Sequence, residues 1–276
     1  MAEVDYEVEY NNRARVPENP ALMAGWARDA AAYRERNAPQ VIRYGPGPRN
    51  TIDLFAGHDF ASRDNAPIVV FIHGGYWQAL DGSSSSHCAR GLNAHGVSVA
   101  VPTYDLCPQV SVDTIIAEMR AATRELARLG RSLVISGHSA GGHLAACMLA
   151  TDWPAYDASL PQDLVTAAYA ISGLFDLVPL VDTSINKALR LDPAAARAAS
   201  PLSWTPPAGR TLDAVVGGQE SAEYFRQSRT IVERWGKAGV ATRFGTVADA
   251  NHFTAIAPLA DPESAMVQRL KELAGG

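Results

Sequence analysis

Apolar residues in this chain fall into short β-branched runs, separated by longer segments in which apolar and polar residues mix. The run APIVVFIHG (66–74) is almost entirely apolar, as expected of a strand that is buried on both faces. We predict strands at 50–57, 66–74, 97–104, 165–171, 211–217 and 241–247, and another at the start of 132–150. Helices are predicted at 20–36, 111–129, 221–238 and 263–274, with a helix-sized segment before 97 and a Pro/Gly loop at 39–49. This alternation is typical of an α/β fold with a mostly parallel central sheet and helices on both faces.

The alternation continues along the chain without an internal repeat or a second apolar core. We therefore expect one α/β domain over residues 1–276, with an N-terminal helical segment at 1–40. The region 176–207 interrupts the alternation, because helix-forming residues and prolines occur there together. We expect this region to form a small helical cap over the carboxyl ends of the strands, where ligands of open α/β sheets bind.

Composition limits the kind of ligand. The chain has 276 residues, of which 47% are hydrophobic, and its net charge is −5. A mildly acidic protein offers no basic surface to nucleic acid or to an anionic membrane, so we expect a small, uncharged or weakly charged ligand. No apolar stretch approaches the roughly 18 residues of a membrane span, and the acidic start MAEVDYEVEYNN is unlike a signal peptide. These features predict a cytoplasmic protein without membrane or nucleic-acid partners, and they are compatible with a homodimer.

The cysteines give no indication of a metal site. Cys88, Cys107 and Cys147 are far apart in the chain and lack the spacing of metal ligands. Free cysteine behaves as a small hydrophobic residue, so we expect buried thiols without a chemical role.

The pentapeptide GHSAG (137–141) matches the GxSxG pattern of a nucleophile elbow. An apolar strand precedes it and an Ala-rich helix follows it, which is the context that the motif requires. In such an elbow the serine lies in a sharp strand-to-helix turn that only small neighbours permit. Ser139 is therefore the predicted nucleophile. The alternative is that the five-residue match arose by chance and that Ser139 is an ordinary helix cap.

The first predicted buried strand ends in HGGYW (73–77), a glycine turn one strand-helix-strand-helix unit before the elbow. Acyl transfer needs preorganised backbone amides for the oxyanion, commonly one after the nucleophile and others from such a turn. We predict that the amides of Ala140 and of Gly74, Gly75 or Tyr76 serve this purpose. The alternative is a simple tight turn whose aromatic side chains pack in the core.

The side chains around this turn are candidates for the substrate pocket. Tyr76 and Trp77 are predicted to narrow the acyl side and to form a wall of an aryl pocket, although Trp77 could also be a core residue. His73 is grouped with them, but we expect it mainly to hold the loop through hydrogen bonds.

A general base must follow the serine in the chain order Ser, acid, His that is typical of this elbow. Only His143 and His252 follow Ser139, and His143 lies inside the helix that the elbow begins. His252, in DANHFTAI after the last predicted strand, is therefore the predicted base.

The acid is less clearly defined by the sequence. Asp176 follows the strand 165–171, Asp213 lies within a predicted strand, and Asp249 precedes His252 by three residues. The turn after the strand 211–217 is the best position by topology, which favours Glu220 over Asp176.

Several longer stretches resemble a known family when taken together. They are HGGYW (73–77), GHSAGGHL (137–144), ISGLFDLVPL (171–180), INKALRLD (185–192) with SPLSW (200–204), ESAEYFRQS (220–228) and NHF (251–253). The combination resembles the kynurenine formamidases (arylformamidases), α/β-hydrolases related to the hormone-sensitive-lipase-like esterases. The resemblance covers nearly the whole chain after about residue 40. In that family the acid precedes an RQS segment by the interval found between Glu220 and Arg226, which also favours Glu220.

The resemblance implies cleavage of an N-formyl arylamine, such as N-formylkynurenine, to formate and the free amine. Ser139 would attack the formyl carbon with His252 as base, and no metal or organic cofactor is needed. Glu220 stands where animal members have aspartate, and Thr254 stands where an acidic residue often follows the HF pair. Both differences leave hydrolysis intact and leave the exact substrate open.

Two other functions remain open at this level. The first is a carboxylesterase or amidase that acts on other small acyl or carbamoyl compounds. The second is a binding module on an inactive hydrolase scaffold, which the presence of Ser139, His252 and an available acid disfavours.

Overall fold

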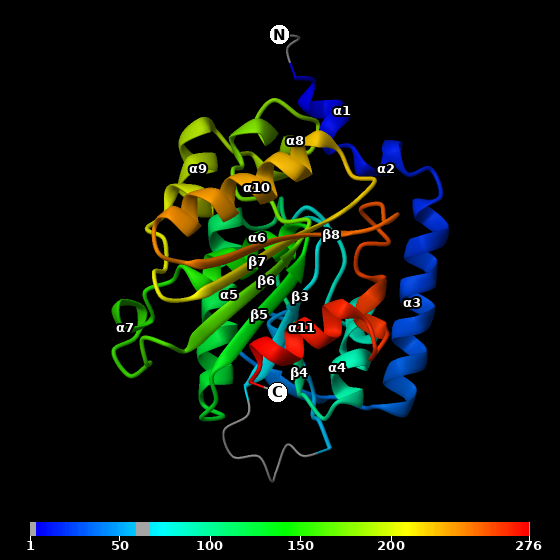
Figure 1. Cartoon of the computed structure of the whole chain (residues 1–276), viewed down its shortest axis with the longest axis vertical. Coiled ribbons are helices and arrows are strands. Elements are labelled where there is room, and N and C mark those ends of the chain that lie inside the picture. Colours follow the sequence, from blue (N-terminus) through cyan, green and yellow to red (C-terminus); the bar gives the residue numbers. More distant parts are fainter. Residues whose placement is uncertain (1–3, 59–66, 276) are drawn as a thin grey trace.

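Eight strands form one sheet in the part of the chain that the structure, a computed structural model, describes, residues 4–58 and 67–275 (Figure 1). Residue 66, at the start of the predicted strand 66–74, lies outside these ranges. The strand order is β1-β2-β4-β3-β5-β6-β7-β8; β1 and β2 run antiparallel to their neighbours, and the others are parallel. The strands are β1 (Gln40–Arg43), β2 (Thr51–Phe55), β3 (Ile68–Ile72), β4 (Val99–Thr103), β5 (Leu133–His138), β6 (Val165–Ile171), β7 (Thr211–Gly217) and β8 (Ala241–Val247).

The predicted strands are confirmed, and one further strand lies where we predicted a loop. β1 falls within 39–49 and pairs antiparallel with β2. The sequence of β1, QVIR, has four residues, and none of them is buried. An edge strand without a buried face carries little periodic signal, so the Pro/Gly residues that follow it dominated the prediction.

The main helices also agree with the prediction. They are α3 (Asn19–Arg36), α5 (Val112–Ala127), α6 (Ala140–Leu149), α10 (Ala222–Lys237) and α11 (Ala265–Leu273), with η1 (Ser83–Ala89) and α4 (Arg90–Ala94) in the segment before 97. Ser111 caps the N-terminus of α5, where its hydroxyl accepts a hydrogen bond of 3.1 Å from the Thr114 amide.

Side chains of the central strands alternate between two cores, one on each face of the sheet. In β3, Ile68, Val70 and Ile72 pack into the core beneath α5, α6 and α10. Val69 and Phe71 pack into the other core, with residues of η1, α4 and α11 and the aromatic side chains of α3. The apolar run in β3 thus fills both layers, which confirms the α/β fold with helices on both faces.

Short helices gather at one end of the molecule, near the N-terminus of α10 (Figure 1). α1 (Tyr6–Tyr10) and α2 (Asn12–Arg15) precede α3. The region 176–207 forms η2 (Val178–Leu180), α8 (Asn186–Leu189), α9 (Pro193–Ala198) and η3 (Pro201–Ser203). Two residues of this region, Ser184 and Ile185, line the cavity that contains Ser139.

The three cysteines are free and buried, as predicted. Burial raises the pKa of the Cys107 thiol to about 11 and raises those of Cys88 and Cys147 further. Thiols of this kind stay protonated and unreactive near neutral pH. Within the described residues, no helix combines the length and the apolar character needed to span a membrane.

Candidate active site

Ser139 joins β5 to α6 in a sharp turn, with φ 56° and ψ −118°. A positive φ is costly for a residue with a side chain, so the surrounding packing must hold it. A Cβ on Gly137 would lie 2.2 Å from the Gly141 carbonyl oxygen, and one on Gly141 would lie 1.9 Å from the Ile72 carbonyl oxygen. Both flanking glycines are therefore required, because the backbone approaches too closely at each position for a side chain. This explains the two glycines of the GHSAG motif.

Glu220 and His252 meet at the end of the sheet although they are far apart in the sequence. The His252 Nδ1 donates a 2.7 Å hydrogen bond to Glu220 Oε2, and the Glu220 side chain is fully buried. The other carboxylate oxygen, Oε1, accepts hydrogen bonds from the Ser172 hydroxyl and, at 2.7 Å, from the Gly217 amide. A carboxylate with each oxygen occupied in this way has one orientation, and it sets the plane of the His252 ring.

The rival carboxylates are engaged elsewhere or point into solvent. Asp213 forms an ion pair of 2.7 Å with Arg269. Asp176 lies 3.9 Å from Arg226 and accepts a hydrogen bond from the Val178 amide. Asp249 is exposed, in a left-handed turn. Of the four candidates from the sequence, Glu220 is the one that contacts His252.

Two aromatic rings enclose the His252 imidazole. The rings of His138 and Tyr224 each lie 4.7 Å from it, measured between centroids. The His138 Nε2 donates a 2.9 Å hydrogen bond to the His252 carbonyl oxygen. Burial, and then the nearby His252, hold the pKa of His138 well below its ordinary value. His138 is therefore a neutral donor that fixes the His252 backbone near pH 7.

The glycine turn after β3 lies directly against the elbow. A Cβ on Gly74 would lie 2.8 Å from the His138 carbonyl oxygen and 3.0 Å from the Ser139 Cβ. Gly75 adopts φ +100°, and a Cβ there would lie 2.4 Å from the Ala79 carbonyl oxygen. Ala140 is the first residue of α6, so its amide has no intrahelical partner. The predicted oxyanion donors thus lie on two backbone segments that meet at Ser139.

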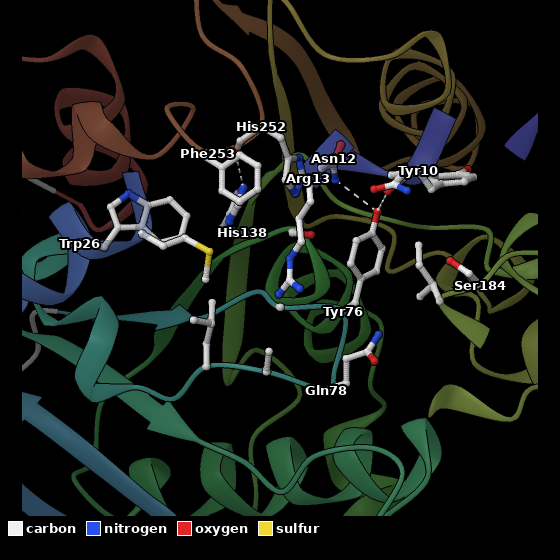
Figure 2. Close-up of a pocket in the computed structure, with 17 residues that line it drawn as sticks. Tyr10, Asn12, Arg13, Trp26, Tyr76, Gln78, His138, Ser184, His252 and Phe253 are labelled. Atoms are coloured by element: carbon white, nitrogen blue, oxygen red, sulfur yellow. Dashed lines mark hydrogen bonds between the residues drawn. The ribbon is translucent and has the colours of Figure 1, made fainter. Parts of the chain in front are cut away.

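Ser139 and His252 line one cavity of about 400 Å³ (Figure 2). Seventeen described residues surround it, and they come from five parts of the chain. These are Tyr10, Asn11, Asn12, Arg13, Met23 and Trp26; Gly75, Tyr76, Gln78, Ala79 and Leu80; His138 and Ser139; Ser184 and Ile185; and His252 and Phe253. Among the described residues, no group of three or more His, Cys, Asp or Glu side chains is arranged to hold a metal ion.

A model of the family with the α/β-hydrolase fold matches residues 69–255, which include the glycine turn, the elbow, Glu220 and His252. The chain belongs to this α/β-hydrolase family. Kynurenine formamidase of Danio rerio is 29% identical over 261 residues, which cover 90% of this chain and 87% of the relative. Kynurenine formamidase of Drosophila melanogaster is 29% identical over 84% of this chain and 80% of the relative. The predicted resemblance is thus confirmed, and this α/β-hydrolase is an enzyme of the formamidase or esterase type.

Solved structures show the same fold. A proposed thioesterase from Silicibacter sp. TM1040 is 34% identical, with a TM-score of 0.79, over 96% of this α/β-hydrolase and 98% of that chain. An esterase from Pyrobaculum calidifontis is 17% identical, with a TM-score of 0.71, over 93% of each chain. The second likeness concerns the fold alone.

Two residues that we predicted for the substrate pocket do not reach it. His73 is buried, stacks on the Tyr104 ring at 4.2 Å, and donates a 2.9 Å hydrogen bond from Nδ1 to the Gly74 carbonyl oxygen. Burial lowers its pKa to about 4, so it is neutral near pH 7. Trp77 is fully buried and packs edge-on against His143 at 5.0 Å. His73 therefore holds the loop, which was the main expectation for it, and Trp77 takes the core position that the sequence left open. Tyr76 and Trp77 both adopt left-handed backbone angles, and only Tyr76 lines the cavity.

Trp77→Ala should therefore lower stability rather than change selectivity. Removing a fully buried tryptophan typically costs about 3–5 kcal/mol, because the cavity that remains collapses only in part. Chemical denaturation should show this loss, whereas Tyr156→Ala, an exposed aromatic control, should cost below about 1 kcal/mol. If the Trp77→Ala enzyme is stable and its ratio of butyryl to formyl turnover is raised, Trp77 contacts the substrate and this prediction is wrong.

The N-terminal segment contributes residues to the site that the sequence analysis missed. The Tyr76 hydroxyl donates to the Tyr10 carbonyl oxygen at 2.7 Å (Figure 2). The Asn12 amide group donates to the Tyr224 hydroxyl at 2.7 Å. The Tyr10 hydroxyl donates to Glu223 at 2.7 Å. The stretch EYNNR carries no periodicity, so polar side chains beside a buried tyrosine were its only signal. These bonds hold α1 and α2 beside the cavity.

Proposed function

We propose that this protein is a serine hydrolase that cleaves the N-formyl group of a small arylamine, with N-formylkynurenine as the model substrate. The products are formate and the free amine. The observation that carries the proposal is the buried hydrogen bond between Glu220 and His252, beside the strained Ser139 and the Gly74–Gly75 turn, in one cavity. The relatives named kynurenine formamidase, aligned over most of the chain, support the formamide as the scissile bond.

In the proposed reaction, Ser139 Oγ attacks the formyl carbon while His252 Nε2 takes the hydroxyl proton. The Nδ1–H of His252 faces Glu220, so Nε2 carries the free lone pair that a base needs. Glu220 keeps this tautomer and stabilises the imidazolium that forms. The oxyanion accepts hydrogen bonds from the backbone amides of Gly74 or Gly75 and of Ala140.

Collapse of the tetrahedral intermediate breaks the C–N bond. The imidazolium of His252 gives its proton to the leaving nitrogen, so the amine departs neutral and Ser139 carries a formyl ester. Water then attacks this ester with His252 again as base, which releases formate and restores the serine. The balance requires one water molecule per turnover and no redox partner.

The cavity is suited to an aromatic substrate of this size. Its volume of about 400 Å³ is within the common range for small-molecule sites. Trp26 and Phe253 lie on one side, with ring centroids 6.0 Å apart, and Tyr76 lies nearer the α1–α2 side (Figure 2). Flat apolar walls of this kind bind an aryl ring, while the single hydrogen of a formyl group needs little space at the serine.

Turnover of N-formylkynurenine beside p-nitrophenyl acetate and p-nitrophenyl butyrate tests the proposal. The expected result is a kcat/KM for the formyl amide at least about 100-fold above that for the butyrate, because transition-state contacts on the aryl side raise both binding and rate. Equal or better turnover of the butyrate would contradict the proposal.

Hydrolysis of other short acyl compounds is the second candidate, and the 34% identical solved relative described as a proposed thioesterase favours it. A short-chain acyl thioester therefore belongs in the same panel. If the thioester has the highest kcat/KM of the panel, it replaces the formamide as the proposed substrate. The proposed roles of Ser139 and His252 stay the same.

A further inference from the structure

We propose that Arg13 forms a carboxylate subsite, so that the enzyme selects aryl substrates whose departing amine also carries a carboxylate. The inference rests on the proposed function, since it specifies the substrate of the same site. It is carried by the position and isolation of one guanidinium group.

Arg13 extends into the cavity beside the residues around Ser139 (Figure 2). Of the seventeen described residues that line the cavity, Arg13 is the only Lys or Arg, and none is Asp or Glu. Within the described part of the chain, no ion pair or side-chain hydrogen bond joins the Arg13 guanidinium to another residue. The cavity therefore holds one positive group whose charge the protein itself does not neutralise.

The backbone of Arg13 is held in place on both sides. Asn12, the preceding residue, is buried and donates hydrogen bonds to the hydroxyls of Tyr224 at 2.7 Å and Tyr76 at 3.2 Å. The Asn11 side chain caps the same turn by accepting from the Ala14 amide at 3.1 Å. The Arg13 carbonyl oxygen accepts a 3.1 Å hydrogen bond from the Asn19 side chain. A long flexible side chain thus starts from a fixed point, which reduces the entropy lost when it binds a ligand.

A guanidinium group prefers a planar anion with two oxygens. Carboxylates fit it with two parallel charge-assisted hydrogen bonds, a geometry that an ammonium group does not offer. The overall charge of −5 suggested an uncharged or weakly charged ligand, but Arg13 places one positive charge in the lining of the cavity. A substrate with an aryl formamide at Ser139 and a carboxylate at Arg13 would neutralise this charge without a protein anion.

A different use of the same group would be stabilisation of the oxyanion at Ser139. The two uses give different results, because an oxyanion forms on every substrate, whereas a carboxylate subsite acts only on substrates that carry one. The test therefore compares two substrates that differ in this group alone.

The experiment uses 4-(2-formamidophenyl)-4-oxobutanoate and its neutral primary amide with the wild-type enzyme and with Arg13→Gln. The ratio of kcat/KM for the acid over that for the amide should fall roughly tenfold to thirtyfold in Arg13→Gln. This is the lower part of the range for a charged hydrogen bond, because the Arg13 residue is exposed to water. Arg13→Lys, which keeps the charge without the two-pronged geometry, should give an intermediate ratio.

Arg15→Gln is the matched control, since it removes the same charge from the same short helix but does not line the cavity. Its ratio of acid to amide turnover should stay within about twofold of wild type. An unchanged ratio in Arg13→Gln, including an equal fall for both substrates, would overturn the carboxylate subsite. An equal change in Arg15→Gln would do so too, because a general electrostatic field would then explain it.

Calorimetric binding of the deformylated acid and its amide separates this inference from the proposed function. Loss of acid preference in Arg13→Gln supports the subsite even if wild-type enzyme does not hydrolyse formamides, in which case the proposed reaction alone fails. Active formamide hydrolysis with no Arg13-dependent acid preference in either measurement leaves the reaction standing and rejects the subsite.

Discussion

Ser139→Ala, His252→Ala and the double variant should each lower kcat by about 10⁴-fold or more, and by similar amounts. The losses should not add, because attack by Ser139 requires the proton transfer to His252, and neither residue contributes without the other. The remaining rate would come from the backbone amides of the Gly74–Gly75 turn and Ala140, which neither substitution removes.

Burst and steady-state kinetics with N-formylkynurenine and p-nitrophenyl acetate would measure these losses. Ser159→Ala and His95→Ala are suitable controls, since neither residue lines the cavity, and both should keep kcat within about twofold. Circular dichroism should show native helix content in every variant. Clear additivity of the two losses, or substantial turnover by Ser139→Ala, would refute the assignment of the nucleophile and base.

Glu220→Gln should lower kcat by roughly 10³- to 10⁴-fold with little change in fold. A glutamine oxygen can still accept from the Ser172 hydroxyl and the Gly217 amide, which leaves its NH₂ group facing His252 Nδ1. The His252 ring must then accept at Nδ1 and carry its proton on Nε2. That tautomer cannot take the proton from Ser139, so the loss comes from the wrong proton position as well as from the missing charge.

Glu220→Asp keeps the charge but is one methylene shorter, so an intermediate loss is expected. Asp176→Asn and Asp249→Asn should cost far less than Glu220→Gln, because Asp176 lies near Arg226 and Asp249 is exposed. Single-turnover rates would separate these variants from effects on product release. Retention of most of the wild-type kcat by Glu220→Gln, combined with a large loss in Asp176→Asn, would move the acid to the turn after β6.

The central strands, the long helices and the elbow were predictable from local sequence. A parallel strand buried on both faces must be apolar over its length, and a long amphipathic helix must repeat with its own period, so both leave a pattern in the chain. GHSAG was equally readable, because Gly137 and Gly141 are required by backbone contacts within a single turn and with β3. His252 followed from chain order, since the other histidine after Ser139 lies inside α6.

The identity of the acid, the walls of the cavity and the position of Arg13 depend on contacts between distant parts of the chain. Glu220 could be ranked above its rivals from topology and resemblance, but its contact with His252 exists only because β7 and the loop after β8 end side by side. Trp77 turns inward because of left-handed backbone angles that its sequence did not indicate. The segment EYNNR has no periodic pattern, and it lines the cavity because side chains on α10 and the glycine turn bind it. Local patterns determine which segments become strands and helices, whereas the position of each side chain in the site depends on long-range packing, which leaves no periodic signal in the sequence.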